Sequence, residues 1–262
     1  MIKAICTFLL LSTAPLGAST MRVVVRCDSG EATVAGGAPG NAVVASSSRR
    51  IDAMTVEVTP RHGETVRIPA AASLEWPSTG NATAHIRDIG GSVIVSTGNG
   101  NLDITNVRGL VEVTTGNGNT RIANVAGGVH VTSISGKTDV FCVGGAVVVK
   151  DTSGQTTVTS AAGDVDLFTA LGKVRYNGAL RADHAYRLRT LDGAVAIGIA
   201  SGGAGYGAQL SADSGQIELD RPLAGKPRRV TLREGDERAR IVLDAVGGRV
   251  ALTRIAAVPS CR

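Results

Sequence analysis

The sequence predicts an all-β protein, a parallel β-solenoid whose 18-residue turns each consist of two nine-residue halves. Three observations support this fold class. Glycine recurs at a fixed step of nine residues, apolar residues alternate with polar ones between the glycines, and aromatic residues make up only 3% of the chain. A core with so few large side chains must consist of thin layers of Val, Ile, Leu and Ala, which is typical of repeat architectures.

The first segment, residues 1–19, has the pattern of a secretory signal peptide. Lys3 supplies a positive start, residues 4–13 are apolar but too few to span a bilayer, and small residues at 17–19 resemble a cleavage site. We therefore expect export to the periplasm, the cell surface or the extracellular space. No other segment is a candidate for a transmembrane span.

Residues 20–81 are less regular. The stretches RVVVR, TVEV and TVRI predict strands, and the GGAPGN loop interrupts them. We expect an N-terminal β region that covers one end of the solenoid, because an uncovered terminal rung is an open sheet edge.

Residues 82–220 carry the repeat. In each half, a glycine precedes two apolar positions, the third and the fifth, and four turn-forming residues follow, which predicts a short strand with one buried face. The repeat glycines are Gly91, Gly100, Gly109, Gly118, Gly127, Gly136, Gly145, Gly154, Gly163 and Gly172. The predicted inward pairs are Val93/Val95, Leu102/Ile104, Val111/Val113, Thr120/Ile122, Val129/Val131, Thr138/Val140, Val147/Val149, Thr156/Val158, Val165/Leu167 and Val174/Tyr176. Each half can pair only with its equivalent one turn away, and glycine is expected to supply the corner conformations.

The repeat also places like residues in columns. Asn99 stands 18 residues before Asn117, and Asn106 stands 18 before Asn124, so their amides are expected to hydrogen-bond along the axis. The outward column Asp103, Arg121, Asp139 alternates in charge. Three extra residues at 181–183 shift the frame, which resumes at Tyr186.

Residues 221–262 are expected to form a basic C-terminal β cap. They contain ten Lys and Arg against four Asp and Glu, whereas residues 88–220 contain nine against twelve. A basic end favours anionic envelope polysaccharide, lipopolysaccharide or another envelope protein as partner. The candidate binding residues are Arg228, Arg229, Arg233, Arg238 and Arg240. Nucleic acid is disfavoured by export and by the scarcity of aromatics for stacking.

Three cysteines follow the signal peptide: Cys27, Cys142 and Cys261. Cys142 falls mid-solenoid in the corner column of Asn106 and Asn124, roughly 15–25 Å from either end at the strand spacing. A disulfide needs Cα atoms within about 7 Å, so we expect Cys142 to bond to neither of the others. Cys27 and Cys261 can pair only if the chain ends meet.

Catalytic, metal and cofactor chemistry finds little support in the pattern. No phosphate loop or nucleophile motif is present, and neither cysteines nor histidines have metal-ligand spacing. In the segment GNGNLDI, Leu102 stands where a calcium-roll repeat needs its ligand aspartate. The enzymatic alternative is a polysaccharide lyase or hydrolase, for which Asp164 and Asp166 on one outward face are the candidate carboxylates. We expect no enzyme activity, no metal and no cofactor.

The units GSVIVSTGNGNLDITNV, GLVEVTTGNGNTRIANV, GVHVTSISGKTDVFCV and GQIEL resemble a bacterial family of unknown function, the β-strand-repeat putative adhesins. The resemblance covers about residues 82–220. It implies an extracytoplasmic β-solenoid with an adhesive or scaffold role, and it provides no catalytic motif.

Overall fold

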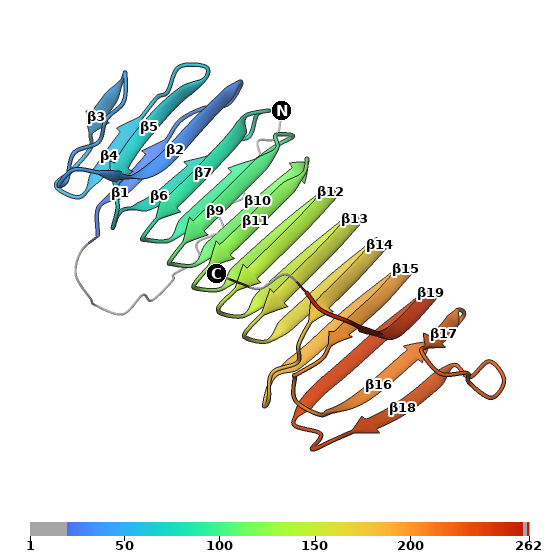
Figure 1. Ribbon diagram of the computed structural model, residues 1–262. Coiled ribbons are helices and arrows are strands. Elements are labelled where there is room, and N and C mark those ends of the chain that lie inside the picture. Colours follow the sequence, from blue (N-terminus) through green and yellow to red (C-terminus); the bar gives the residue numbers. More distant parts are fainter. Residues whose placement is uncertain (1–19, 259–260, 262) are drawn as a thin grey trace, which may run out of the picture.

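The computed structural model describes residues 20–258 and 261, and within these residues the fold is all-β (Figure 1). The predicted signal peptide lies outside the described residues. Within the described part, 19 strands form one mostly parallel sheet, and no helix there could cross a bilayer. The strands are β1 Arg22–Val25, β2 Glu31–Ala38, β3 Ser48–Arg50, β4 Thr55–Val58, β5 Glu64–Pro69, β6 Ser73–Pro77, β7 Thr83–Ile89, β8 Val93–Thr97, β9 Leu102–Val107, β10 Val111–Asn117, β11 Thr120–Val125, β12 Val129–Val143, β13 Val147–Ala161, β14 Val165–Gly178, β15 Ala185–Ala200, β16 Tyr206–Ala212, β17 Gln216–Leu219, β18 Arg229–Glu234 and β19 Ala239–Ile255.

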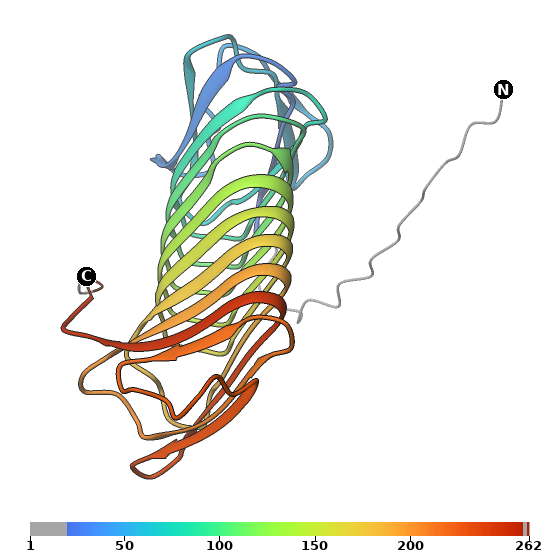
Figure 2. The ribbon, with the colours of Figure 1, turned by 90° about the vertical axis from the view of Figure 1, so that its right-hand side faces the viewer.

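Strands stack one above another in parallel, in successive rungs that Figure 2 shows side by side. Val93 pairs with Val111, which pairs with Val129, which pairs with Val147, so the register advances by the 18 residues of the repeat. Val165 pairs with Tyr186, which confirms that three extra residues lengthen one step.

Each rung contributes one strand to each of two faces. The first face consists of β4, β1, β6, β8, β10, the first halves of β12 to β15 and of β19, then β16 and β18. The second face consists of β5, β2, β7, β9, β11, the second halves of the same long strands, then β17. The first corner leads from the first face to the second within a rung, and the second corner leads to the next rung.

The order of rungs in space differs from their order in the chain at both ends. The β4–β5 rung lies outermost, because β1 and β2 separate it from β6 and β7. At the other end, β19 lies between β15 and the β16–β17 rung, inside the stack. Of the described strands in 221–262, the segment expected to form a cap, only β18 lies at the end of the stack. It pairs antiparallel with β16. At the opposite end, β3 pairs antiparallel with β4. These antiparallel strands cover the two terminal edges of the first face.

All twenty of the predicted inward residues between Val93 and Tyr176 are buried. The core between the two faces therefore consists mainly of β-branched side chains, as the low aromatic content requires. Tyr176 and Tyr186 also lie in the core, with ring centroids 5.0 Å apart. The Tyr186 hydroxyl accepts a hydrogen bond from the backbone N–H of Arg181 at 2.8 Å.

The repeat glycines are required mainly by close stacking, which corrects the expected role in corner conformation. Of the ten, only Gly136 and Gly172 have a positive φ. A Cβ on Gly118 would stand 2.2 Å from the carbonyl oxygen of Gly100 one rung below. The left-handed corner positions are occupied instead by residues such as Asn106 and Asn124, both with φ of 57°.

The predicted amide columns form hydrogen-bonded ladders. Asn117 Nδ2 donates to Asn99 Oδ1 at 2.7 Å, and Asn124 Nδ2 donates to Asn106 Oδ1 at 3.2 Å, which confirms the bonding along the axis. In the charged column, Arg121 lies in register between Asp103 and Asp139, but the ion pair of Asp139 is formed with Lys137, at 2.6 Å. The amide ladders tie neighbouring rungs together at both corners.

The prediction for Cys142 is wrong, because Cys142 and Cys261 form a disulfide with Cα atoms 5.4 Å apart. The prediction assumed that the chain ends at the terminal rung, but β19 lies inside the stack and residues 256–258 run back along it (Figure 1). Six residues from Ile255 can span about 20 Å. The four rung spacings from β19 to β12 require about 19 Å. Cys27 is a free, buried thiol whose pKa is raised by burial.

Candidate functional site

The predicted arginines lie near the end of the first face. Arg229 and Arg233 belong to β18, and Arg240 belongs to β19. In the strand register, Arg233 and Arg240 lie on either side of Gly207 in β16, and Arg229 lies opposite Ser211. All three are exposed on the outward side. The structure therefore brings together residues from two separate stretches of the sequence.

Arg228 and Arg238 are also exposed, but they lie in the loops before β18 and β19. Arg238 forms an ion pair with Asp183, which raises the pKa of the guanidinium. These two arginines therefore lie outside the strand positions that bring the other three together.

Sequence reasoning missed Arg187 and Arg189 on β15. They pair in register with Val242 and Asp244 of β19, one strand further along the same face. Their outward alternation on β15 is visible in the sequence, but their proximity to the other arginines depends on β19 pairing with β15. We call the set Arg187, Arg189, Arg229, Arg233 and Arg240 the basic face. It extends over four adjacent strands, about 14 Å from first to last.

Three members of the basic face, Arg187, Arg229 and Arg240, have no ion pair within the described residues. Arg189 contacts Asp166 at 3.2 Å and stands 6.0 Å from the centre of the Phe168 ring. The Arg233 pair with Glu237 is long, at 3.8 Å, and its guanidinium side chain is 74% exposed. Asp244 of β19 lies in register beside Arg189, but the arginines of the basic face still outnumber the carboxylates among and beside them, so the face presents an excess of positive charge to solvent.

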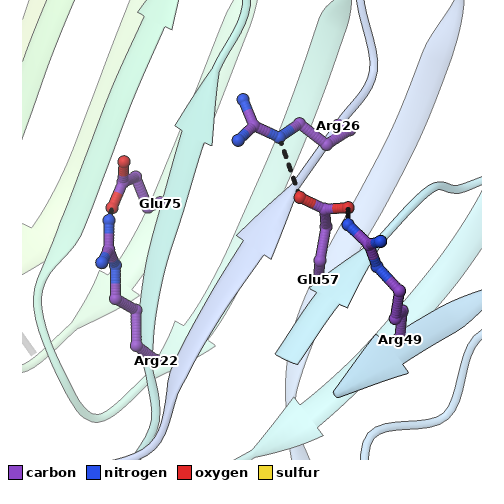
Figure 3. Close-up of polar contacts among 5 residues, drawn as sticks. All are labelled: Arg22, Arg26, Arg49, Glu57 and Glu75. Atoms are coloured by element: carbon purple, nitrogen blue, oxygen red, sulfur yellow. Dashed lines mark hydrogen bonds and ion pairs between the residues drawn. The ribbon is translucent and has the colours of Figure 1, made fainter. Parts of the chain in front are cut away.

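Arginines at the opposite end of the first face are held in ion pairs with carboxylates, as Figure 3 shows. Glu57 accepts from Arg26 at 3.2 Å and from Arg49 at 3.0 Å, while Glu75 pairs with Arg22. These contacts, with the hydrogen bond from Arg26 foremost, lower the pKa of the Glu57 carboxyl. The two ends therefore differ in pairing: Arg22, Arg26 and Arg49 each have a carboxylate partner, whereas three of the five arginines of the basic face have none within the described residues.

In the C-terminal half of the molecule, which carries the basic face, the second face has a shallow depression of about 870 Å³. Its floor consists of small outward residues on β15 and β19, such as Ala196 and Ala251, which leave space that larger side chains fill elsewhere. Lys173 and Arg175 of β14 line one side, and Glu218 of β17 lines the other. Cations thus border both faces of this half of the molecule.

The two candidate carboxylates of the enzymatic alternative are both held in exposed polar contacts. Asp164 accepts hydrogen bonds at 2.9 Å from the backbone N–H of Ala185 and from His184 Nδ1, and these lower its pKa, the backbone bond most. Asp166 pairs with Arg189. Neither lines the depression on the second face. A general acid needs a raised pKa, so the environment of Asp164 is unfavourable for that role.

The described residues contain neither a cluster of metal ligands nor an exposed aromatic platform for sugars. No group of three or more His, Cys, Asp or Glu side chains there could hold a metal ion. Tyr176, Tyr186 and Tyr206 are all buried, so they form no exposed stacking platform.

No protein-family model matches the sequence, and no curated protein matches it. A crystal structure from Clostridium sporogenes, described as a "putative cell adhesion protein", matches with 10% identity over 92% of this chain and 95% of that chain. Its TM-score of 0.24 is too low to carry an argument about the fold or the function of this chain.

Proposed function

We propose that this protein is an exported parallel β-solenoid with 18-residue turns that acts as a non-catalytic, adhesin-like scaffold or binding module of the cell envelope. Its ligand is anionic polysaccharide, bound on the basic face. The observation that carries this proposal is the gathering of five exposed arginines from β15, β19 and β18 within a span of four adjacent strands, three of them without an ion pair within the described residues.

The 18-residue register and the continuous buried core between two faces support the solenoid architecture. The signal-peptide pattern of residues 1–19 supports export. The contacts of Asp164 and Asp166 support a role without catalysis, because each carboxylate is engaged with a cationic or backbone donor.

An extended polymer suits the shape of the basic face. The arginines stand on a flat strand surface at spacings set by the rungs. Adjacent strands are about 4.8 Å apart, and Arg233 and Arg240 are two strands apart, on either side of Gly207. A small anion would contact one or two of them, whereas a chain with regularly spaced sulfate, phosphate or carboxylate groups can contact several. Guanidinium groups also bind such groups through two parallel hydrogen bonds.

Binding of dextran sulfate, with uncharged dextran as the control ligand, tests this proposal. We expect binding to dextran sulfate alone, with affinity that falls steeply as NaCl is raised, because exposed charges are screened within about 8 Å at physiological ionic strength. Arg229→Ser combined with Arg240→Ser removes two unpaired cations. At about 0.5–1 kcal/mol for each exposed contact, affinity should fall roughly 5- to 30-fold.

The matched control is Arg26→Ser combined with Arg49→Ser, which removes two arginines that are both paired with Glu57. Equal losses in both double variants would show that overall charge, and not the basic face, governs binding. Depolymerisation of a glycan that is abolished by Asp164→Asn would overturn the non-catalytic role.

A further inference from the structure

Four aliphatic side chains project into solvent along the first corner of the C-terminal half. Ile134 is 59% exposed, Leu171 55%, Leu191 52% and Val246 48%. We call these four residues the corner ridge. They belong to β12, β14, β15 and β19, each at the point where the strand passes from the first face to the second.

The members of the corner ridge come together although they are far apart in sequence. Ile134, Leu191 and Val246 stand in one register column, and Leu171 stands in the adjacent column, in register with Asp192. The strands β12, β13, β14, β15 and β19 are consecutive neighbours, so the ridge extends over four strand spacings, or about 19 Å. Between Ile134 and Leu191, the column contains Thr152 of β13, which is exposed, and Ala170 of β14, which is half-buried. Toward the other end, the same corner carries the polar ladder of Asn99 and Asn117. The apolar character is therefore confined to one half of the corner.

Cations border the ridge on both sides. In the register, Lys150 and Arg189 occupy the outward column next to it on the first face, and Lys137, Lys173 and Arg249 occupy the column next to it on the second face. All five are exposed. Their long side chains can reach along the ridge while their charged groups remain in a polar layer.

Acidic residues are fewer in these two columns. Asp244 is the acid in the column on the first face, and Asp192 lies in the corner itself. Asp139, Asp166 and Glu218, which pair with three of the cations, stand one column further from the ridge. Exposed ion pairs of this kind contribute at most about 1 kcal/mol, so an anionic surface can compete with them.

We propose that the corner ridge docks on the surface of a lipid bilayer that contains anionic phospholipid. A convex line of aliphatic side chains can enter the boundary between headgroups and acyl chains, and the cations on both sides can contact phosphate groups. A bilayer accommodates a protrusion directly, whereas a protein partner would need an apolar groove with acidic rims. This inference goes beyond polysaccharide binding, because it uses the corner and shares only Arg189 with the basic face.

Flotation of the purified protein with lipid vesicles tests the docking. Vesicles of phosphatidylcholine with phosphatidylglycerol should carry the protein, and vesicles of phosphatidylcholine alone should not. Leu171→Ser combined with Leu191→Ser should weaken binding at least tenfold and leave dextran sulfate binding unchanged. The matched control, Ile94→Ser combined with Leu110→Ser, removes two aliphatic side chains of similar exposure away from the ridge and should bind as the unaltered protein does.

The proposal is overturned if the unaltered protein does not float with anionic vesicles, or if the two double variants bind them equally. It is also overturned if the protein is a dimer by light scattering and the Leu171→Ser, Leu191→Ser variant is a monomer, since the ridge would then contact a second copy. If the unaltered protein floats with anionic vesicles but does not bind dextran sulfate, only the polysaccharide proposal is contradicted.

Discussion

Replacing Asp151 by Thr should stabilise the protein at neutral pH and leave it little changed in acid. Asp151 is 3% exposed and lies in the inward corner column that also contains Ser133 and Thr169, which carry no charge. Neither of its carboxylate oxygens has a hydrogen-bond partner of good geometry within the described residues. Thr is the residue found at the equivalent place one rung further along, so the substitution fits the site.

The magnitude follows from the pKa of the buried carboxyl. Burial raises this pKa from an ordinary 3.8 to about 6, and the backbone N–H groups of Ser153 and Thr152 offset only part of the rise. Because the folded state binds the proton more tightly than the unfolded state, stability falls as pH rises from about 3.8 to about 6. Each pH unit corresponds to about 1.4 kcal/mol, so the ionised group costs about 3 kcal/mol above pH 6.

Denaturant unfolding followed by circular dichroism at a series of pH values measures this effect. The free energy of unfolding of Asp151→Thr minus that of the unaltered protein should be constant below about pH 4, increase by about 3 kcal/mol up to pH 6, and then level off. Asp192→Thr, which removes an exposed aspartate at the same corner, should show no such increase. A difference for Asp151→Thr that is the same at pH 4 and pH 7 would refute the argument from burial.

Three further predictions concern packing and the disulfide. Val113→Asp should lower the unfolding free energy by several kcal/mol, because Val113 is buried in the core. Glu112→Gln, on the outward side of the same strand, should change the unfolding free energy little. Equal melting temperatures for the two variants would show that the inward register is wrong. Cys142→Ser should cost about 2–4 kcal/mol and make stability insensitive to reductant; a free Cys142 thiol in unreduced peptide maps of the unaltered protein would contradict the bond. Gly118→Ala should destabilise by about 1–3 kcal/mol because its Cβ would meet a carbonyl oxygen at 2.2 Å. Gly207→Ala, whose Cβ would make only an ordinary contact, 3.6 Å from a Glu237 carboxylate oxygen, serves as the control in the same denaturation assay.

The sequence by itself determined the local pattern of this protein. Period-two alternation identifies inward residues such as Val113 and Val149, since successive side chains of a strand point to opposite faces. The 18-residue step places Asn99 and Asn117 in one column, and the three extra residues before Tyr186 shift the register as the pattern requires. These features depend on short stretches of chain and their equivalents one turn away, so periodicity contains the necessary information.

Only the tertiary structure decided which rungs are neighbours at the two ends. Every rung has a similar strand pattern, so alternation allows β15 to pair with β16 as well as with β19, and sequence order favours the former. The structure places β19 beside β15. This brings Arg240 to the strand next to Arg187, two residues away in register, and Val246 beside Leu191. The same placement lets the chain end run back to Cys142. The basic face, the corner ridge and the disulfide all follow from this long-range pairing, which a periodic sequence leaves unspecified because its repeats are alike.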